Sequence, residues 1–490
     1  MTPELTYGLS TPHYSPLYLW TLASVIAHVL RRLRPGHLWT FRWNLGFCPH
    51  ETPMNAWDFL ARRQGNIREL WLKTDPECSF RPSDNGYLPL TTFKSLRLLS
   101  WRGISLHRGG LETLRDWFGC DLGRVSILEL SFGRWQAATL AYSRMRPDAE
   151  CRNFVYHDIL NLKPGQRRCR LPSLVQLKVD FDFHDLKFEM AYAFNFEKLR
   201  KLSFWNCPRL SKFLGALVGS NFNLQLSFLE ICGRLDKEAA IETDSVTAFI
   251  KSFTGLKSLC LFVDHQPSEV EKYVEAIVHH KDTLKNLVYD VQSLYTKILD
   301  SNDIPPWLFH CWVQYPLEVL FLETRLERLK RSGLSRMCAA SPLKYLHVRA
   351  ADEKIEDYFV EDMAVAEEKH RNDPQYVDYP LPTWGTLLND TRLLVSMTDR
   401  PRVRCDFLQW AFGPEAFPNL EIVAFGDATS DDSALLLFGH NSASNGSVPS
   451  EYGDDYVCRN FVPLGRDNGV VRKYWRYIQS SHRESDLIYE

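Results

Sequence analysis

The chain has 490 residues, of which 45% are hydrophobic and 13% aromatic, and its 58 Lys and Arg residues nearly balance 60 Asp and Glu residues. This composition allows a large buried core, and the small net charge gives no global electrostatic reason to expect nucleic-acid binding. Twelve cysteines occur without a Cys-x-x-Cys pair, which argues against zinc ribbons and small disulfide scaffolds and favours free thiols in a reducing compartment, cytoplasmic or nuclear.

The first predicted element is an apolar run from Leu17 to Leu30, which Arg31 and Arg32 follow. A helix needs about 20 apolar residues to cross a bilayer, and this run has 14. We therefore expect no membrane partner. The run predicts an amphipathic helix within an N-terminal helical cap at residues 1–37.

A pattern of three apolar positions, Leu-x-x-Leu-x-Leu with apolar substitutions, then recurs along most of the chain. The first four copies start at residues 38, 67, 96 and 125, a spacing of 29 residues, and the later steps are mostly 25 to 33 residues. This period is typical of leucine-rich repeats. The twelve copies lie at 38–43, 67–72, 96–101, 125–130, 174–179, 199–204, 226–231, 256–261, 284–289, 317–322, 343–348 and 420–425.

The last two apolar positions of each copy are two residues apart, so in a strand both point to one face. One copy cannot bury its apolar side chains alone, and stacking on the next copy joins the strands into a parallel sheet. Helical spacing predicts returning helices at 55–63, 111–118, 210–218, 245–253 and 270–279, with Asp244 and Ser245 as one start signal. The fold class we predict is α/β, a leucine-rich-repeat solenoid or horseshoe with a parallel concave sheet and a helical convex side. Unrelated strands in an ordinary mixed domain are the alternative, against which the even spacing argues.

The charge and spacing of the segments between and after the repeats predict the remaining domain organisation. We expect the repeat array at 38–350, with a basic insertion at about 140–171, and an acidic helical insertion at 351–383. Final repeat units follow at 384–430. An irregular C-terminal cap occupies 431–490, in which Val471, Tyr474, Trp475 and Ile478 share one face of a helix.

The common signatures of catalysis do not occur in the sequence: there is no phosphate-binding glycine loop, nucleophile elbow or His-Glu-x-x-His. We therefore expect no enzyme activity, no cofactor and no metal. Three clusters have ordinary explanations. Asp180, Asp182, His184 and Asp185 fit a solvated strand edge, His279 with His280 fits a helix C-terminus, and His310 with Cys311 fits an aromatic core.

The positions between the buried residues of each strand point to the opposite face of the sheet, and they are the predicted binding surface. Exposed Trp, Arg, Tyr and Phe in a row are typical of protein interfaces. We expect a protein target on the concave sheet, and the predicted partner-binding residues are Arg42, Trp71, Arg102, Glu129, Lys178, Trp205, Glu230, Phe321, Tyr345 and His347.

Three segments carry a family resemblance: "HLWTFRW" at 37–43, "FLARRQGNIRELWL" at 59–72 and "LRKLSFWNC" at 199–207. The chain resembles fungal F-box and leucine-rich-repeat proteins directly after their F-box. The resemblance implies an intracellular substrate receptor of a cullin-RING ubiquitin ligase, which binds a cullin adaptor through the F-box and its target through the repeats. Residues 2–33 lack the Leu-Pro-x-Glu-Leu type of helix that opens an F-box, so we expect a family member without a recognisable F-box.

The sequence as a whole predicts a non-catalytic, protein-binding scaffold, a recognition subunit that uses its concave sheet. The alternatives are an F-box-type ligase receptor, an enzyme assembled across repeats, and a nucleic-acid binder that uses the basic insertion from Arg144 to Arg170. Nucleic-acid binding is the least favoured partner class, because the whole chain is nearly neutral.

Overall fold

A computed structural model describes most of the repeat array and several segments after it. The described residues are 16–44, 56–74, 89–104, 108–132, 159–160, 162, 169–180, 183, 189–205, 207, 210–220, 222–232, 239–263, 269–291, 315–323, 341–349, 406–413, 416–425, 436–440, 461–464 and 468–480. The chain forms two compact units, Met1–Leu226 and Ser227–Glu490, called unit 1 and unit 2 below.

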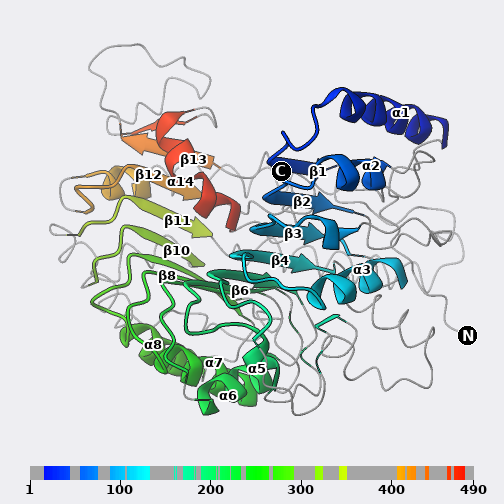
Figure 1. Ribbon diagram of the computed structural model, residues 1–490. Helices are drawn as coiled ribbons and strands as arrows, with labels where there is room; N and C mark the ends of the chain where they lie inside the picture. The colour runs from blue at the N-terminus through cyan, green and yellow to red at the C-terminus, as the bar shows by residue number, and fades with distance from the viewer. Residues whose placement is uncertain are drawn as a thin grey trace, which may run out of the picture. The chain divides into compact units, whose positions relative to one another are not determined.

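The described part of unit 1 is built on six parallel strands that pair in chain order (Figure 1). Adjacent strands pair without a shift in register, so that Leu70 lies beside Leu99 and Leu99 beside Leu128. The strands are β1 (Thr40–Asn44), β2 (Glu69–Lys73), β3 (Leu98–Arg102), β4 (Ile127–Ser131), β5 (Gln176–Val179) and β6 (Lys201–Trp205).

The three apolar positions of each copy form the core of unit 1, which explains why the strands occur where they do. In the second copy Ile67, Leu70 and Leu72 are all buried. The equivalent positions of the next copies are buried as well and stack on them across the sheet. Each fully buried Leu or Ile stabilises the fold by about 1.5–3 kcal/mol, so the register of the strands follows from the pattern.

Helices connect the strands of unit 1 and cover the apolar side of the sheet. They are α1 (Pro16–Arg32), α2 (Ala56–Arg63), the 3-10 helix η2 (Leu90–Thr92), α3 (Arg108–Phe118), α5 (Glu189–Ala193) and α6 (Leu210–Gly219). Helix α1 lies beside α2, where the Arg63 side chain donates a hydrogen bond to the Arg31 carbonyl over 3.3 Å. Gly36 has a φ of 73° in the turn after α1, a conformation that glycine adopts without strain.

The described part of unit 2 also contains a parallel sheet, but its last two strands are antiparallel. Strands β7 to β12 pair in parallel and in chain order, whereas β13 and β14 pair antiparallel at the end of the sheet. The strands are β7 (Phe228–Cys232), β8 (Ser258–Val263), β9 (Asn286–Val291), β10 (Val319–Glu323), β11 (Tyr345–Arg349), β12 (Ile422–Phe425), β13 (Leu436–His440) and β14 (Phe461–Pro463).

Three named helices belong to unit 2: α7 (Ala239–Lys251), α8 (Val270–Val278) and α14 (Gly469–Ser480). The predicted start of the first was wrong. Asp244 and Ser245 lie inside α7 and do not cap it, because the helix already begins at Ala239. Asp244 instead accepts a salt bridge of 2.6 Å from Lys272 of the next helix.

The α/β class and the mostly parallel sheet are confirmed, and each of the twelve copies supplies one strand, β1 to β12. Several predicted features lie outside the described residues: most of the basic insertion, the acidic insertion at 351–383, the segment 384–405 and most of the cap at 431–490. Asp182, His184, Asp185, His310 and Cys311 also lie outside them.

Candidate protein-binding face

The face of each sheet that points away from the buried leucines is called its open face here. On the open face of unit 1 the strands bring five residues into one row: Arg42, Trp71, Ser100, Glu129 and Lys178 are consecutive partners in the parallel register. They come from sequence positions as far apart as 136 residues. Four of the five were predicted binding residues, and the spacing alone assigns them to this face.

Glu129 is the centre of an ionic network on this face. Its carboxylate accepts a hydrogen bond of 2.7 Å from the Ser100 hydroxyl and one of 2.9 Å from Nε of Arg102. The ammonium of Lys178 lies 3.5 Å from the same carboxylate. The two cations and the hydroxyl around the carboxylate offset the free-energy cost of burying its charge.

Burial raises the pKa of Glu129, but the charges of Lys178 and Arg102, together with the hydrogen bonds from Ser100 and Arg102, outweigh that effect. The pKa of Glu129 therefore lies below its ordinary value of 4.5. The carboxylate stays charged at neutral pH and holds two basic side chains in place on the face.

Two tryptophans of the open face, Trp71 in the row and Trp205 beside it, lie next to cations of the row. The Arg42 guanidinium lies 5.1 Å from the centre of the Trp71 ring, and the Lys178 ammonium lies 3.7 Å from that of Trp205. Such cation–π contacts fix the orientation of the rings. Neither indole N–H has a hydrogen-bond partner among the residues that the structure describes. Both indole nitrogens are themselves buried, so the parts of the two side chains that remain exposed are carbon atoms of the rings.

Asp180, which the sequence places at a solvated strand edge, is buried instead. Its two carboxylate oxygens accept hydrogen bonds of 2.6 Å from the Ser131 hydroxyl and from the backbone N–H of Phe132. The expectation of solvation was wrong for this residue, because the polar groups of β4 replace water around it. Asp180 closes the end of β4 and is a structural residue.

The open face of unit 2 differs from that of unit 1, because the described members of its central row are all buried, whereas in unit 1 Arg42, Trp71 and Lys178 keep some exposure. Phe321, Tyr345 and His347 have exposed fractions of 3%, 1% and 0%. The expectation that these side chains form an exposed surface was wrong, and the same holds for Glu230 and for Glu129 of unit 1, which are also buried. Their predicted role as contacts for a partner requires exposure that they lack in this structure.

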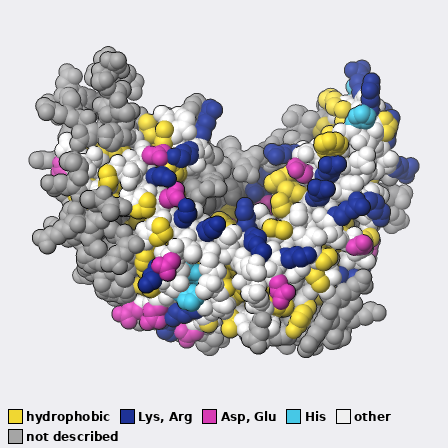
Figure 2. Space-filling view, turned by 60° about the vertical axis from the view of Figure 1, so that its left-hand side comes forward, with side chains coloured by type: hydrophobic (Ala, Val, Ile, Leu, Met, Phe, Trp, Pro, Cys, Tyr) yellow, Lys and Arg dark blue, Asp and Glu magenta, His cyan; other side chains and the backbone are white. Residues whose placement is uncertain are grey.

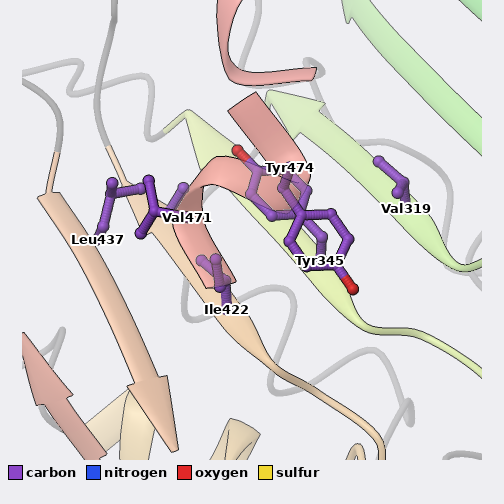
Figure 3. Packing of buried hydrophobic residues seen from close by; sticks show 7 residues of the cluster. Val319, Tyr345, Ile422, Leu437, Val471 and Tyr474 are labelled. Carbon is purple, nitrogen blue, oxygen red and sulfur yellow. The ribbon is translucent and has the colours of Figure 1, made fainter. Parts of the chain in front are cut away.

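Helix α14 covers part of this face, and Figure 3 shows it lying across β11 and its neighbours. Tyr474 stacks on Tyr345, with ring centres 5.3 Å apart and the planes 19° from parallel. Val471 packs into the same cluster, and Lys473 makes a salt bridge of 2.8 Å with Glu421. The apolar face of α14 therefore fills the position that a partner would need.

The sequence contains the signal for this helix but gives no indication of where it docks. Val471 and Tyr474 share one helix face, which indicates that the helix is packed on something. The surface it covers lies more than 120 residues earlier in the chain, at Val319 and Tyr345. The apolar pattern of one helix does not indicate which distant segment of the chain the helix packs against.

The remaining candidate groups in the described part of the chain show packing roles. Cys207 and Cys232 are buried thiols outside any disulfide, as expected for packing residues. His280 is buried at the end of α8, and its Nε2 lies 2.9 Å from the Ile250 carbonyl oxygen. Burial, with a smaller effect of His279, lowers the pKa of His280 despite that hydrogen bond. Within the described ranges no group of three or more His, Cys, Asp or Glu residues is arranged to hold a metal ion.

Comparison of the chain with models of known protein families gives no match, and comparison with curated proteins gives no significant match. Among the helices that the structure describes, none has the length and apolar character to span a bilayer. The assignment of a function therefore rests on the geometry of the open face of unit 1.

Proposed function

We propose that this protein is a non-catalytic recognition subunit with the leucine-rich-repeat horseshoe fold, and that it binds a protein target on the concave, open face of unit 1. The single observation that carries the proposal is the row Arg42, Trp71, Glu129 and Lys178, with Trp205 of β6 in contact with Lys178. Trp and Arg are the residues most enriched in the energetically important centres of protein interfaces.

The electrostatics of the row support this use. The Glu129 carboxylate fixes Arg102 and Lys178, which lie at 2.9 Å and 3.5 Å from it. A binding surface whose side chains are already ordered loses less entropy when a partner binds. The Glu129 network therefore supports pre-organisation of the face, and the partly exposed rings of Trp71 and Trp205 supply apolar contact area.

The contrast between the two open faces also supports a binding site on unit 1. The equivalent row of unit 2 is buried and mostly apolar, with Glu230 and His347 as its polar members, and α14 covers part of this face. A permanently buried core has this composition. Half-exposed aromatic and charged side chains instead suit a surface that is hydrated until a partner binds.

The test is quantitative affinity capture with the full chain and a Trp71→Ala, Trp205→Ala double variant. We expect one set of proteins to be lost from the variant, because the loss of two interface tryptophans lowers affinity by about 2–4 kcal/mol or more. The matched control is Arg115→Ala with Lys212→Ala on α3 and α6, which should retain the whole set. Recovery of the same proteins by all forms would contradict the proposal.

Folding of the variants is checked separately, by circular dichroism and thermal unfolding. Neither indole makes a hydrogen bond within the described residues, and both rings are partly exposed. We expect native-like spectra for the double variant, so that lost capture reports on binding.

We propose an F-box-type receptor of a cullin-RING ubiquitin ligase as a second candidate, and one observation favours it besides the sequence resemblance. Helix α1 exposes Val25 and Val29, with exposed fractions of 54% and 53%, one turn apart. An exposed apolar helix face before the first strand is a suitable docking surface for an adaptor. A Val25→Asp, Val29→Asp variant should then lose a cullin adaptor in capture while it keeps the target protein. Absence of any cullin from the wild-type capture would contradict this candidate.

A further inference from the structure

The near-neutral charge of the chain conceals two strongly charged parts. Residues 1–226 contain 30 Lys and Arg against 19 Asp and Glu, a net charge of +11, whereas residues 227–490 contain 28 against 41, a net charge of −13. Charge asymmetry of this size means that the first part attracts acidic partners and the second repels them. In the view of Figure 2, Lys and Arg side chains stand beside hydrophobic ones on the described surface.

The edge at which the strands of unit 1 begin carries part of this charge. The residue directly before each strand donates its backbone N–H to the carbonyl of the equivalent residue before the previous strand, in every case over 2.8 Å. These six residues form what we call the strand-entry ladder. They are Trp39, Arg68, Arg97, Ser126, Val175 and Arg200.

The side chains of the strand-entry ladder combine cations with exposed apolar groups. Trp39 and Val175 have exposed fractions of 60% and 41% and are among the most exposed large hydrophobic residues in the described ranges. The Arg68 guanidinium lies 4.6 Å from the centre of the Trp39 ring. Arg68 and Arg97 are exposed, and no ion pair of theirs occurs among the described residues.

The equivalent edge of unit 2 shows that such cations are not a requirement of the fold. There the ladder contains Lys285, Glu318, Lys344 and Glu421 in succession. Glu318 pairs with both lysines, over 3.0 Å and 2.9 Å, and Glu421 pairs with Lys473 of α14 over 2.8 Å. The charges from Lys285 to Glu421 are thus neutralised within unit 2, although Lys257, which precedes Lys285 in the same ladder, is exposed. In unit 1 the charges of Arg68 and Arg97 remain for a partner.

We propose that the strand-entry ladder of unit 1 binds an acidic polypeptide segment that also carries apolar side chains. This inference rests on the proposed protein-binding function and names the chemistry of the segment. Carboxylates pair with Arg68 and Arg97, for which the planar guanidinium is well suited, and apolar side chains cover Trp39 and Val175. Arg200 adds positive charge at the end of the ladder, while its guanidinium donates hydrogen bonds to the Glu197 and Leu199 carbonyls and to Gln225.

An acidic peptide fits the ladder better than a nucleic acid does. A nucleic-acid strand carries a phosphate at every nucleotide, yet the middle of the ladder, Ser126 and Val175, offers no cation. A polypeptide can place apolar residues there and acidic residues on both sides. Six strands at about 4.8 Å extend over about 24 Å, the length of about seven extended residues.

The probe for the test is a fluorescein-labelled synthetic peptide of about twelve residues, long enough to cover the ladder, in which Asp and Glu alternate with Leu and Phe. Anisotropy titrations with the full chain should show saturable binding that weakens with added salt. The Arg68→Ala, Arg97→Ala double variant should bind it about five- to tenfold more weakly, as expected for two exposed charge pairs. The Arg115→Ala, Lys212→Ala control removes the same charge elsewhere on unit 1 and should bind like the wild type.

Three further titrations separate the alternatives. A peptide with Gln and Asn in place of Glu and Asp should not bind, and a peptide of Glu alone should bind more weakly because Trp39 and Val175 lose their contacts. Equal affinity of the ladder variant and the control, tighter binding of single-stranded RNA of similar length than of the acidic peptide, or no binding of the acidic peptide would each overturn the proposal. The protein-binding function itself would still be tested by the Trp71 and Trp205 variant, whose capture result does not depend on the ladder.

Discussion

Replacing Glu129 with Gln should destabilise unit 1 strongly, although the two side chains have nearly the same shape. Gln keeps the hydrogen bond with Ser100 but removes the negative charge that Arg102 and Lys178 share at 2.9 Å and 3.5 Å. Removing one partner of a buried ion pair costs about 3–5 kcal/mol. The two cations keep 16% and 20% exposure and can be partly hydrated, so we expect about 2–3 kcal/mol.

The assay is thermal and urea unfolding followed by tryptophan fluorescence, which reports on Trp101 and Trp117 in the core of unit 1. The expected loss corresponds to a decrease in Tm of about 5–10 °C for a unit of this size. The control is Asp116→Asn, because Asp116 is 68% exposed and lies 3.9 Å from Arg115. A surface pair of this kind should contribute less than about 1 kcal/mol.

The pH dependence of the free energy of unfolding tests the ionic role of Glu129 independently. The pKa of Glu129 is lowered in the folded chain from an ordinary value of 4.5, so the unfolded chain binds the proton more readily. The stabilisation is therefore fully present above about pH 5.5, and it is lost as the pH falls through the pKa of the folded state. The wild-type and Gln variant curves should converge at low pH. A difference below about 0.5 kcal/mol at pH 7, or one that grows as the pH falls, would refute the ionic role of Glu129.

Three other perturbations test the described packing. Tyr474→Ala removes the ring stacked on Tyr345, and we expect a cost of about 3–5 kcal/mol and faster proteolysis near α14, measured by limited trypsin digestion. Thr74→Val removes a hydroxyl that accepts a hydrogen bond of 3.0 Å from the Trp101 indole, which should cost about 1–3 kcal/mol in urea unfolding. Burial lowers the pKa of His280, so its contribution to stability should be lost as the pH falls below about 6.5, and His280→Gln should reduce that loss in unfolding measured between about pH 5 and 8.

The strands could be predicted from the sequence because the spacing of apolar residues and the position of each strand both follow from burial of the same side chains. Leu70 and Leu72 are buried since only apolar residues two apart can face the core from one strand. Their spacing therefore fixes both the position of β2 and the outward direction of Trp71. The same reasoning assigned Arg42 and Lys178 to the open face.

The details that the sequence missed depend on contacts between distant segments. The hydrogen bond from Ser131 to Asp180 spans 49 residues, and the stack of Tyr345 with Tyr474 spans an even longer part of the chain. Spacing shows which side of the sheet a residue occupies, but exposure depends on whatever else packs there. For this reason the outward direction of Phe321 and His347 was foreseeable and their burial was not.

The start of α7 shows a smaller limit of the same kind. Asp244 and Ser245 have the residue types of a helix cap, yet the helix extends through them to Ala239. A contact with Lys272 of α8 satisfies the Asp244 side chain. Local start signals therefore compete with contacts between neighbouring helices, and here the latter prevail.

The most direct test of the central claim is hydrogen–deuterium exchange of the full chain with and without a target protein identified by the capture experiment. We expect slower exchange in β1 to β6, which carry the open face of unit 1, with little change in the strands that α14 covers. Protection confined to unit 2, or to helices α2 and α3, would contradict the assignment of the binding face.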